Sequence, residues 1–309
     1  GAGTTAWTAT NGDTTFDAVV SPVVPGSVAD KAQTAAVTDL NADSADVNET
    51  VTYTKVGSLV PSSSDGNFPG APTVVYPNDP SDATKITPAG VPTVPGYTAH
   101  DPEGHVLTPG SSYQPSDPTK DTTITYTADT QKGSVSYVDD TTGKTLKTDS
   151  ISGTTGSKSS YSTSGSIADY KKQGYELVTD GYPADLTFDN DDTTDQNFTV
   201  HLKHQLTPVN PTDPQTPGTP INPDEPDGPK WPTSTNYDKT VNETISYVDQ
   251  NGHVVAKQHT DSVNFTRTVV VDNVTGEVIT SGAGTTAWTA TNGDTTFDAV
   301  VSPVVPGSV

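Results

Sequence analysis

The stretch KGSVSYVDDTTGKTLKTD, residues 132–149, carries the clearest hairpin pattern in the chain. A strand is predicted over Ser134–Val138, a turn over Asp139–Gly143 and a second strand over Lys144–Asp149. Successive side chains of a strand point to opposite faces, so the alternation of apolar and polar residues buries one face of this hairpin. The stretch therefore predicts a β-hairpin that contributes two strands to a small mixed sheet.

A helix and two further strands are predicted in the same region, residues 127–205. The segment SIADYKKQG predicts a short helix with Ser166 at its N-cap, Lys171 and Lys172 in its last turn, and Gly174 just past its end. The segments YELVTD and QNFTVHLKH then read as strands, the second with apolar residues at alternate positions. The order strand, strand, helix, strand, strand suggests a ubiquitin-like β-grasp domain.

The two ends of the chain carry the same sequence. Residues 1–28 and residues 282–309 both read GAGTTAWTATNGDTTFDAVVSPVVPGSV, so residue 1 matches residue 282. An identity of this length indicates a recent tandem duplication, and the chain covers parts of successive units of an array. One module is predicted to join residues 237–309 to a segment with the sequence of residues 29–57. Long identical units favour a fibre or surface stalk over an enzyme.

Two proline-rich segments separate these regions. Residues 58–126 contain twelve prolines and predict an extended connector, either packed in part on a neighbour or flexible. In residues 206–236, proline recurs at every third position from Pro208 to Pro232. Polyproline II has three residues per turn, so this spacing predicts a semi-rigid rod. A PxxP ligand for SH3-type domains is the functional alternative.

Composition excludes several classes of protein. The 309 residues carry a net charge of −23, only 30% hydrophobic residues, and neither Cys nor Met. Several small cores are expected instead of a single large one. No disulfide or thiolate metal site can form, and the negative charge disfavours nucleic acid. No apolar run approaches about 20 residues, so no membrane insertion is expected within this sequence.

No catalytic residue and no cofactor is predicted. The sequence has no GxSxG, Walker or HExxH motif. His201 and His204 lie three apart in a predicted strand and therefore on opposite faces, which argues against joint metal ligation. Both are expected at the surface, near the end of the strand.

One acidic loop is a weak calcium candidate through Asp189, Asp191 and Asp195. It begins like an EF-hand loop but has Thr194 where the glycine belongs and Val200 where the glutamate belongs. A solvated acidic loop is the favoured interpretation.

The tryptophans are the candidate glycan contacts. Sugar rings stack on flat aromatic side chains, so an exposed Trp7, its repeat equivalent Trp288, or Trp231 in the proline-rich segment would suit a glycan. Packing of Trp7 and Trp288 on their own sheet is the alternative, and it is the one that we favour from the sequence.

Several of these stretches resemble the mucus-binding (Mub/MucBP) repeats of lactobacillus cell-surface adhesins. The resemblance is carried by SVSYVDDTTGKTLKTDSISG, by IADYKKQGYELVTDGYPADLTFDNDDTTDQNFTVHLKH, by the spacer PTDPQTPGTPINPDEPDGPKWP, by TVNETISYVDQNGHVVAKQ with the FTRTVVVDNVTGEVIT that follows it, and by the connector that begins YPNDPSDATK. It implies an extracellular protein anchored to a Gram-positive cell wall, with mucin glycans as ligands and, in some members, immunoglobulins. No ligand-binding residue can be transferred, because no short motif defines the site.

Taken together, the expected fold is mainly β, with α+β modules arranged as an elongated tandem array of small β-grasp domains joined by proline-rich extended spacers. Its expected parts are the C-terminal part of a first-type Mub module (1–57), a proline-rich connector (58–126), a second-type MucBP domain (127–205), a polyproline II linker (206–236) and the N-terminal part of the next first-type module (237–309).

The expected function is non-enzymatic. We expect an adhesin repeat that binds mucin glycans with avidity from many copies and that also serves as a stalk. The alternatives are a purely structural stalk or filament, with end-to-end association of copies, and an immunoglobulin-binding module.

Overall fold

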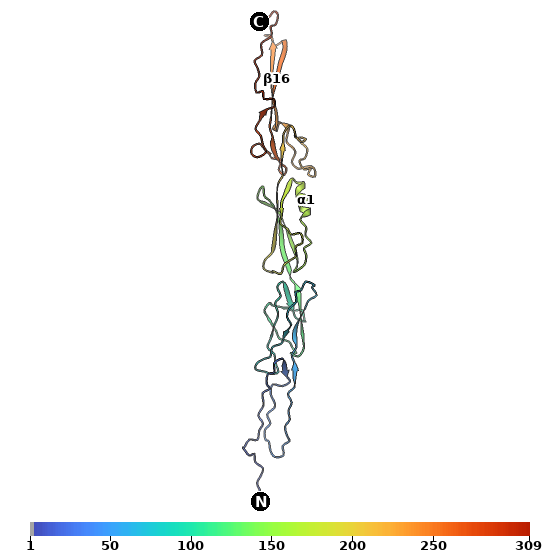
Figure 1. The fold of residues 1–309 in the computed structure, drawn as a ribbon, viewed down its shortest axis with the longest axis vertical. Coiled ribbons are helices and arrows are strands. Elements are labelled where there is room, and N and C mark those ends of the chain that lie inside the picture. Colours follow the sequence, from blue (N-terminus) through green and yellow to red (C-terminus); the bar gives the residue numbers. More distant parts are fainter. Residues whose placement is uncertain (1–2) are drawn as a thin grey trace. The chain divides into compact units, whose positions relative to one another are not determined.

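The computed structural model describes residues 3–309, which are mainly β (Figure 1). It divides into two compact units, one of Gly1–Gly133, Ser152–Ser159 and Asp185–Gln196, and one of Ser134–Ile151, Ser160–Ala184 and Asn197–Val309. The part of the chain described has a single α-helix, and that helix is too short to cross a membrane.

A five-stranded sheet forms the core of the first unit. Its strand order is β4-β3-β9-β6-β7, and β3 runs parallel to β9 while the other neighbours are antiparallel. The strands are β3 (Ser58–Ser62), β4 (Val74–Val75), β6 (Tyr97–His100), β7 (Val106–Leu107) and β9 (Thr122–Ala128). Two small ladders accompany this sheet, formed by β1 (Ser27–Ala29) with β2 (Tyr53–Lys55) and by β5 (Ala89–Gly90) with β8 (Ser112–Tyr113).

The prediction of an extended connector over residues 58–126 is wrong. These residues build the five-stranded sheet, and its core includes the almost fully buried side chains of Leu59, Tyr76, Ile124 and Tyr126. The alternation in TTITYTA buries every second side chain of β9, and that burial outweighs the tendency of proline to stay extended. Pro61 is tolerated because β4 pairs only with the start of β3.

A four-stranded sheet with one helix follows. The strands are β10 (Thr130–Asp139), β11 (Lys144–Thr154), β12 (Tyr175–Asp180) and β13 (Gln196–His204), in the order β11-β10-β13-β12, with α1 (Ser164–Lys172) between β11 and β12 in the chain (Figure 1). The predicted order of two strands, a helix and two strands is confirmed. The ladder from β10 to β13 is parallel, because Ser134 contacts Asn197 and Thr141 contacts His204 at a constant offset.

The C-terminal end of α1 matches the sequence prediction, and the N-terminal end does not. The helix begins at Ser164, so the predicted N-cap at Ser166 is wrong, and the hydroxyl of Thr163 donates instead to Asp180 Oδ2 at 2.6 Å. Gly174 follows the helix with φ of +98°, as predicted, and its N–H donates to Lys171 O. A Cβ at Gly174 would lie 2.4 Å from Asn273 O, so this glycine also allows a close backbone approach.

The polyproline II rod predicted over residues 206–236 is also wrong. Residues 206–209 form β14 (Leu206–Val209), which pairs with β17 (Val269–Asp272), and the following residues fold back in turns. Ile221 N donates to Pro229 O and Trp231 N donates to Thr219 O, both at 2.9 Å. Polyproline II needs a solvated backbone, whereas burial of apolar residues between these prolines favours a packed fold. That core contains Val209, Ile221, Tyr237, Val269 and Val271.

Two hairpins form a further part of the second unit, and both turn at sequence signals for a tight turn, Asn251-Gly252 and the segment 273–276. β15 (Asp238–Val248) pairs with β16 (Val254–Thr266) through the turn at Gly252, and the two strands run side by side in Figure 1. β17 (Val269–Asp272) pairs with β18 (Val278–Ile279) through the turn at Gly276. The 3₁₀ turn η1 (Ser234–Asn236) precedes β15, and β19 (Thr289–Ala290) pairs with the end of β16.

Candidate functional site

Trp7 lies at the surface of the first unit. Its side chain is 87% exposed, which contradicts the favoured expectation that it packs on its own sheet. Beside it is a shallow hollow of about 600 Å³ with the polar side chains of Thr10, Asp13 and Asn41 in its wall. An exposed indole next to amide and carboxylate groups has the chemistry of a surface that can hold a sugar or a protein loop.

Trp288 has the same local sequence but different surroundings. It is half-buried, and the Arg267 guanidinium lies 4.4 Å from the centroid of its ring, with the Lys239 ammonium 5.2 Å away. Arg267 is fixed in turn by its Nε, which donates to Asn236 O at 2.8 Å. Two cations near one indole stabilise its position by cation–π attraction and leave less of its ring surface for a sugar.

Trp231 is also half-buried. It packs against the core of residues 206–236 and β17, and its backbone carbonyl accepts a hydrogen bond from Gly218 N at 3.0 Å. The structure therefore gives Trp231 a role in folding the proline-rich segment. The three tryptophans therefore have three different local settings.

The acidic loop of residues 189–195 uses its carboxylates to form turns. Asp189 Oδ1 accepts from Asp191 N at 3.1 Å, and Asp191 Oδ1 accepts from Thr193 N and from Thr193 Oγ1 at 2.9 and 2.7 Å. The hydrogen bonds from Thr193 hold the pKa of Asp191 below its usual value. Within residues 3–309, Asp189, Asp191 and Asp195 are not gathered around a common point.

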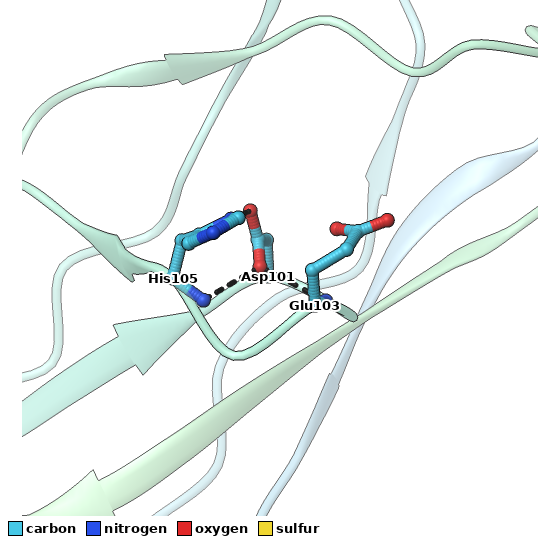
Figure 2. A group of neighbouring side chains, drawn as sticks. All are labelled: Asp101, Glu103 and His105. Carbon is cyan, nitrogen blue, oxygen red and sulfur yellow. Dashed lines mark hydrogen bonds and ion pairs between the residues drawn. The ribbon is translucent and has the colours of Figure 1, made fainter.

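Three other side chains in the described residues do gather, namely Asp101, Glu103 and His105 (Figure 2). Asp101 Oδ1 accepts from Glu103 N at 3.0 Å and from His105 N at 2.8 Å, and Asp101 Oδ2 lies 3.2 Å from His105 Nδ1. Burial alone would raise the pKa of Asp101, but the hydrogen bonds from His105 and Glu103 outweigh it and lower the pKa.

The same turn recurs elsewhere with a different middle residue. Asp249 Oδ1 accepts from Asn251 N and His253 N, both at 2.9 Å, and its other oxygen lies 3.4 Å from His253 Nδ1. The Asp–His pair is therefore a recurring device for closing a hairpin turn. The cluster around Asp101 is explained by that device without a metal ion.

The most unusual polar contact in the second unit is at His204. Its Nε2 lies 2.6 Å from Asp139 Oδ2, at the turn between β10 and β11, and its Nδ1 lies 2.7 Å from Asp272 Oδ2, at the turn between β17 and β18. The histidine side chain is only 4% exposed, so its expected surface position is wrong. His201 does lie near the surface, with Nδ1 2.8 Å from Asp140 Oδ1.

The electrostatics of this site favour a charged histidine. Burial would lower the pKa of His204, but the hydrogen bonds with Asp272 and Asp139 outweigh it and raise the pKa. Burial alone would raise the pKa of Asp139, but its hydrogen bond with His204 outweighs this effect and the pKa is lowered. Because both ring nitrogens are bound to carboxylates, His204 is a structural tie and has no nitrogen left to act as a base on a substrate.

The second unit also has an aromatic cluster of Tyr161, Tyr182 and Phe198, which the sequence did not predict. The ring of Tyr182 lies edge-on to Tyr161 at 5.3 Å and to Phe198 at 5.5 Å between centroids, and all three are half-buried. Tyr161 also donates its hydroxyl hydrogen to Asp149 Oδ2 at 2.7 Å, and Lys147 lies 3.2 Å from the same oxygen. The alternation in β13 placed Phe198 on one face of the strand, but only the fold brings the two tyrosines beside it.

Comparison with known proteins places these features in a family. A model described as mucin binding domain matches residues 131–204, and a model described as Muc B2-like domain matches residues 1–57 and 232–309. The comparison with curated proteins found no match.

Two solved structures are similar to the chain. The crystal structure of Mub-RV is 35% identical over 57% of this chain and 83% of its own, with a TM-score of 0.42. The type 2 repeat of the mucus binding protein MUB from Lactobacillus reuteri is 34% identical over 57% of this chain and 84% of its own, with a TM-score of 0.38. On these sequence matches, the chain belongs to the mucus-binding (Mub) repeat family of surface adhesins.

Proposed function

We propose that this chain is an adhesin repeat that binds mucin glycans, weakly at each module, and that also serves as a stalk on the bacterial cell wall. The observation that carries the proposal is the match of residues 131–204 to a mucin binding domain. The parallel pairing of β10 with β13, with α1 between β11 and β12 in the chain, supports a compact β-grasp for this module. Exact repetition of residues 1–28 at 282–309 supports the stalk.

Charge distribution supports contact between this module and acidic glycans. Seven of the chain's 15 basic residues lie within residues 131–204, although the whole chain carries −23. They are Lys132, Lys144, Lys147, Lys158, Lys171, Lys172 and Lys203. The same residues include eleven acidic side chains, so the region is still net negative, and its lysines only reduce the repulsion that the rest of the chain exerts on acidic sugars.

The aromatic cluster of Tyr161, Tyr182 and Phe198 supplies the apolar part of the proposed contact. Its rings are partly accessible, and the Tyr161 hydroxyl donates to Asp149, which pairs with Lys147. Aromatic edges and faces next to charged groups suit a sugar, which has C–H surfaces and hydroxyls on one ring. We therefore place the proposed glycan contact on this cluster and not on the cation-covered Trp288.

Binding of the full chain to immobilised mucin tests the proposal. Tyr182→Ala should weaken binding severalfold, and so should the double substitution of exposed Lys171 and Lys172 by Ala. Lys257→Ala, on exposed β16, is the matched control and should leave binding unchanged. Wild-type protein that shows no saturable binding to mucin would refute the function. Equal binding by all variants would refute the location.

The same assay separates the alternatives. Immobilised immunoglobulin G in place of mucin tests immunoglobulin capture, for which an exposed strand edge would be the contact. A chain that binds neither ligand acts as a stalk alone. The remaining alternative partner is a second copy of the chain, through end-to-end association.

A further inference from the structure

A small cavity in the first unit has an apolar wall. Its volume is about 200 Å³, and β6, β7 and β9 each contribute to its wall. Its apolar side chains are those of Val91, Val94, Tyr97, Ala99, Leu107 and Tyr126. They belong to the core of the five-stranded sheet or pack on it, and the Tyr126 hydroxyl donates to Pro92 O at 2.5 Å. The core of the sheet therefore fixes the shape of this cavity.

Two carboxylates lie at the same cavity. Asp129 directly follows β9, and Asp192 belongs to the acidic loop of residues 189–195. The Thr98 hydroxyl donates to Asp129 Oδ1, and Gln131 Nε2 donates to Asp192 Oδ1 at 2.6 Å. Gln131 is only 4% exposed, so its amide is a fixed donor. Both carboxylates are therefore held in place by side chains of the first unit.

The charges around these two carboxylates do not balance. Burial raises the pKa of Asp129, and the hydrogen bond and negative charge of Asp192 raise it further. The hydrogen bond from Thr98 lowers this pKa, and so does the nearby His100, but the net shift of the pKa is upward. None of the described residues in the wall is a lysine or an arginine. Two adjacent carboxyl groups in this setting either share a proton or take up a cation.

An organic cation fits the cavity better than a metal ion. Calcium takes about six to eight oxygen ligands, and within residues 3–309 the side chains that gather closely enough to hold a metal are those of Asp101, Glu103 and His105. A metal ion also gains nothing from a wall of valine and leucine. The aliphatic stem of an alkylammonium ion buries apolar surface against that wall, and its N–H groups can donate to both carboxylates. A neutral sugar would leave the two negative charges unbalanced.

We propose that this cavity binds a primary ammonium group carried on an aliphatic stem, with the ammonium between Asp129 and Asp192 and the stem against the apolar wall. A lysine side chain of a partner protein and a free alkylamine share this chemistry. The cavity is open to solvent at β7, where Val106 lines it and is 64% exposed. The net charge of −23 attracts either cation towards the chain. This site uses none of the residues of the proposed glycan contact, so the two are tested independently.

Titration of the isotope-labelled full chain with n-pentylammonium at pH 7, followed by NMR, tests the proposal. We expect saturable shifts of the Thr98 and Ala99 amides, which lie on β6 beside the cavity. Pentan-1-ol has the same stem without the charge and should bind about tenfold more weakly. N-acetyl-lysine methylamide distinguishes the sources. If it shifts the same amides, a protein lysine can be the ligand, and if only n-pentylammonium shifts them, the ligand is a free amine.

A matched pair of variants tests the role of the carboxylates. Asp192→Asn keeps an acceptor for Gln131 but removes one charge, and it should weaken n-pentylammonium binding about tenfold. Asp195→Asn removes the same charge from the same loop at a residue that does not line the cavity, and it should leave binding unchanged. Unchanged spectra elsewhere in each variant show that the fold is kept. The proposal is overturned if n-pentylammonium gives no saturable shifts with the wild type, if pentan-1-ol binds as tightly, or if Asp192→Asn binds like the wild type.

Discussion

At His204, one imidazole ties together two hairpin turns of the second unit. The protonated ring lies between the carboxylates of Asp139 and Asp272, at 2.6 and 2.7 Å, and all three side chains are buried. Its pKa is raised above the ordinary value of 6.5, so the stabilisation is fully present below 6.5 and is lost as the pH rises through the folded pKa. The pKa of Asp139 is lowered below 3.8, so its contribution is lost only as the pH falls through that lower value.

Replacing the histidine should be costly. His204→Gln leaves the buried carboxylates of Asp139 and Asp272 without their charged partner, and we expect a loss of about 3–5 kcal/mol in the free energy of unfolding. Urea unfolding at pH 6, followed through tryptophan fluorescence, measures it. The decline of wild-type stability above pH 6.5 should also be absent in the variant. His201→Gln, at a partly exposed pair with Asp140, is the control and should change stability by less than about 1 kcal/mol. A wild type whose stability is flat from pH 6 to 9 would contradict this account.

A second residue-scale test concerns Gly174. It combines a φ of +98° with a position where a Cβ would meet Asn273 O at 2.4 Å. Gly174→Ala should therefore destabilise the second unit by about 1–3 kcal/mol. Gly165→Ala lies within α1, has open space around it and should be neutral or stabilising by up to about 1 kcal/mol. Equal thermal midpoints for the two variants would show that the close approach is unimportant.

At the scale of elements, the proline-rich segment of residues 206–236 shows how burial competes with local preference. Proline at every third position favours polyproline II, but the apolar residues between the prolines share one core with β17. Pro208 lies on β14, which is an edge strand that pairs only with β17. The missing N–H of Pro208 therefore costs no hydrogen bond of that ladder.

Amide hydrogen exchange separates the two descriptions of this segment. The N–H groups of Ile221 and Trp231 donate to backbone carbonyls at 2.9 Å and should be strongly protected. The exposed amides of Asp224 and Asp227 in the same segment should exchange at nearly the rate of an unstructured peptide. Rapid exchange of the Ile221 and Trp231 amides would instead support the polyproline II rod for residues 206–236.

At the scale of the whole molecule, repetition is the property that most affects function. If each module binds mucin weakly, chains with several repeats should bind much more tightly than one repeat through effective concentration alone, with a gain of about 10²–10⁴. Surface binding of chains with one, two and four repeats, at low and high mucin density, measures this gain. At low mucin density, chains with one, two and four repeats should bind with similar affinity. Identical binding at both densities would exclude avidity.

Local sequence alone determined the hairpin turns at Gly252 and Gly276, the end of α1 at Gly174 and the order of elements in residues 127–205, because each depends on neighbours within a few residues. The family resemblance was also readable from sequence, and the matches to residues 131–204 and to both chain ends confirm it. Tertiary structure decided the rest. The folding of both proline-rich segments, the burial of His204 and the different settings of Trp7 and Trp288 depend on residues far away in the chain. Burial of apolar groups outweighs the local preference of the backbone in the proline-rich segments, and the two carboxylates offset the cost of burying the charge of His204.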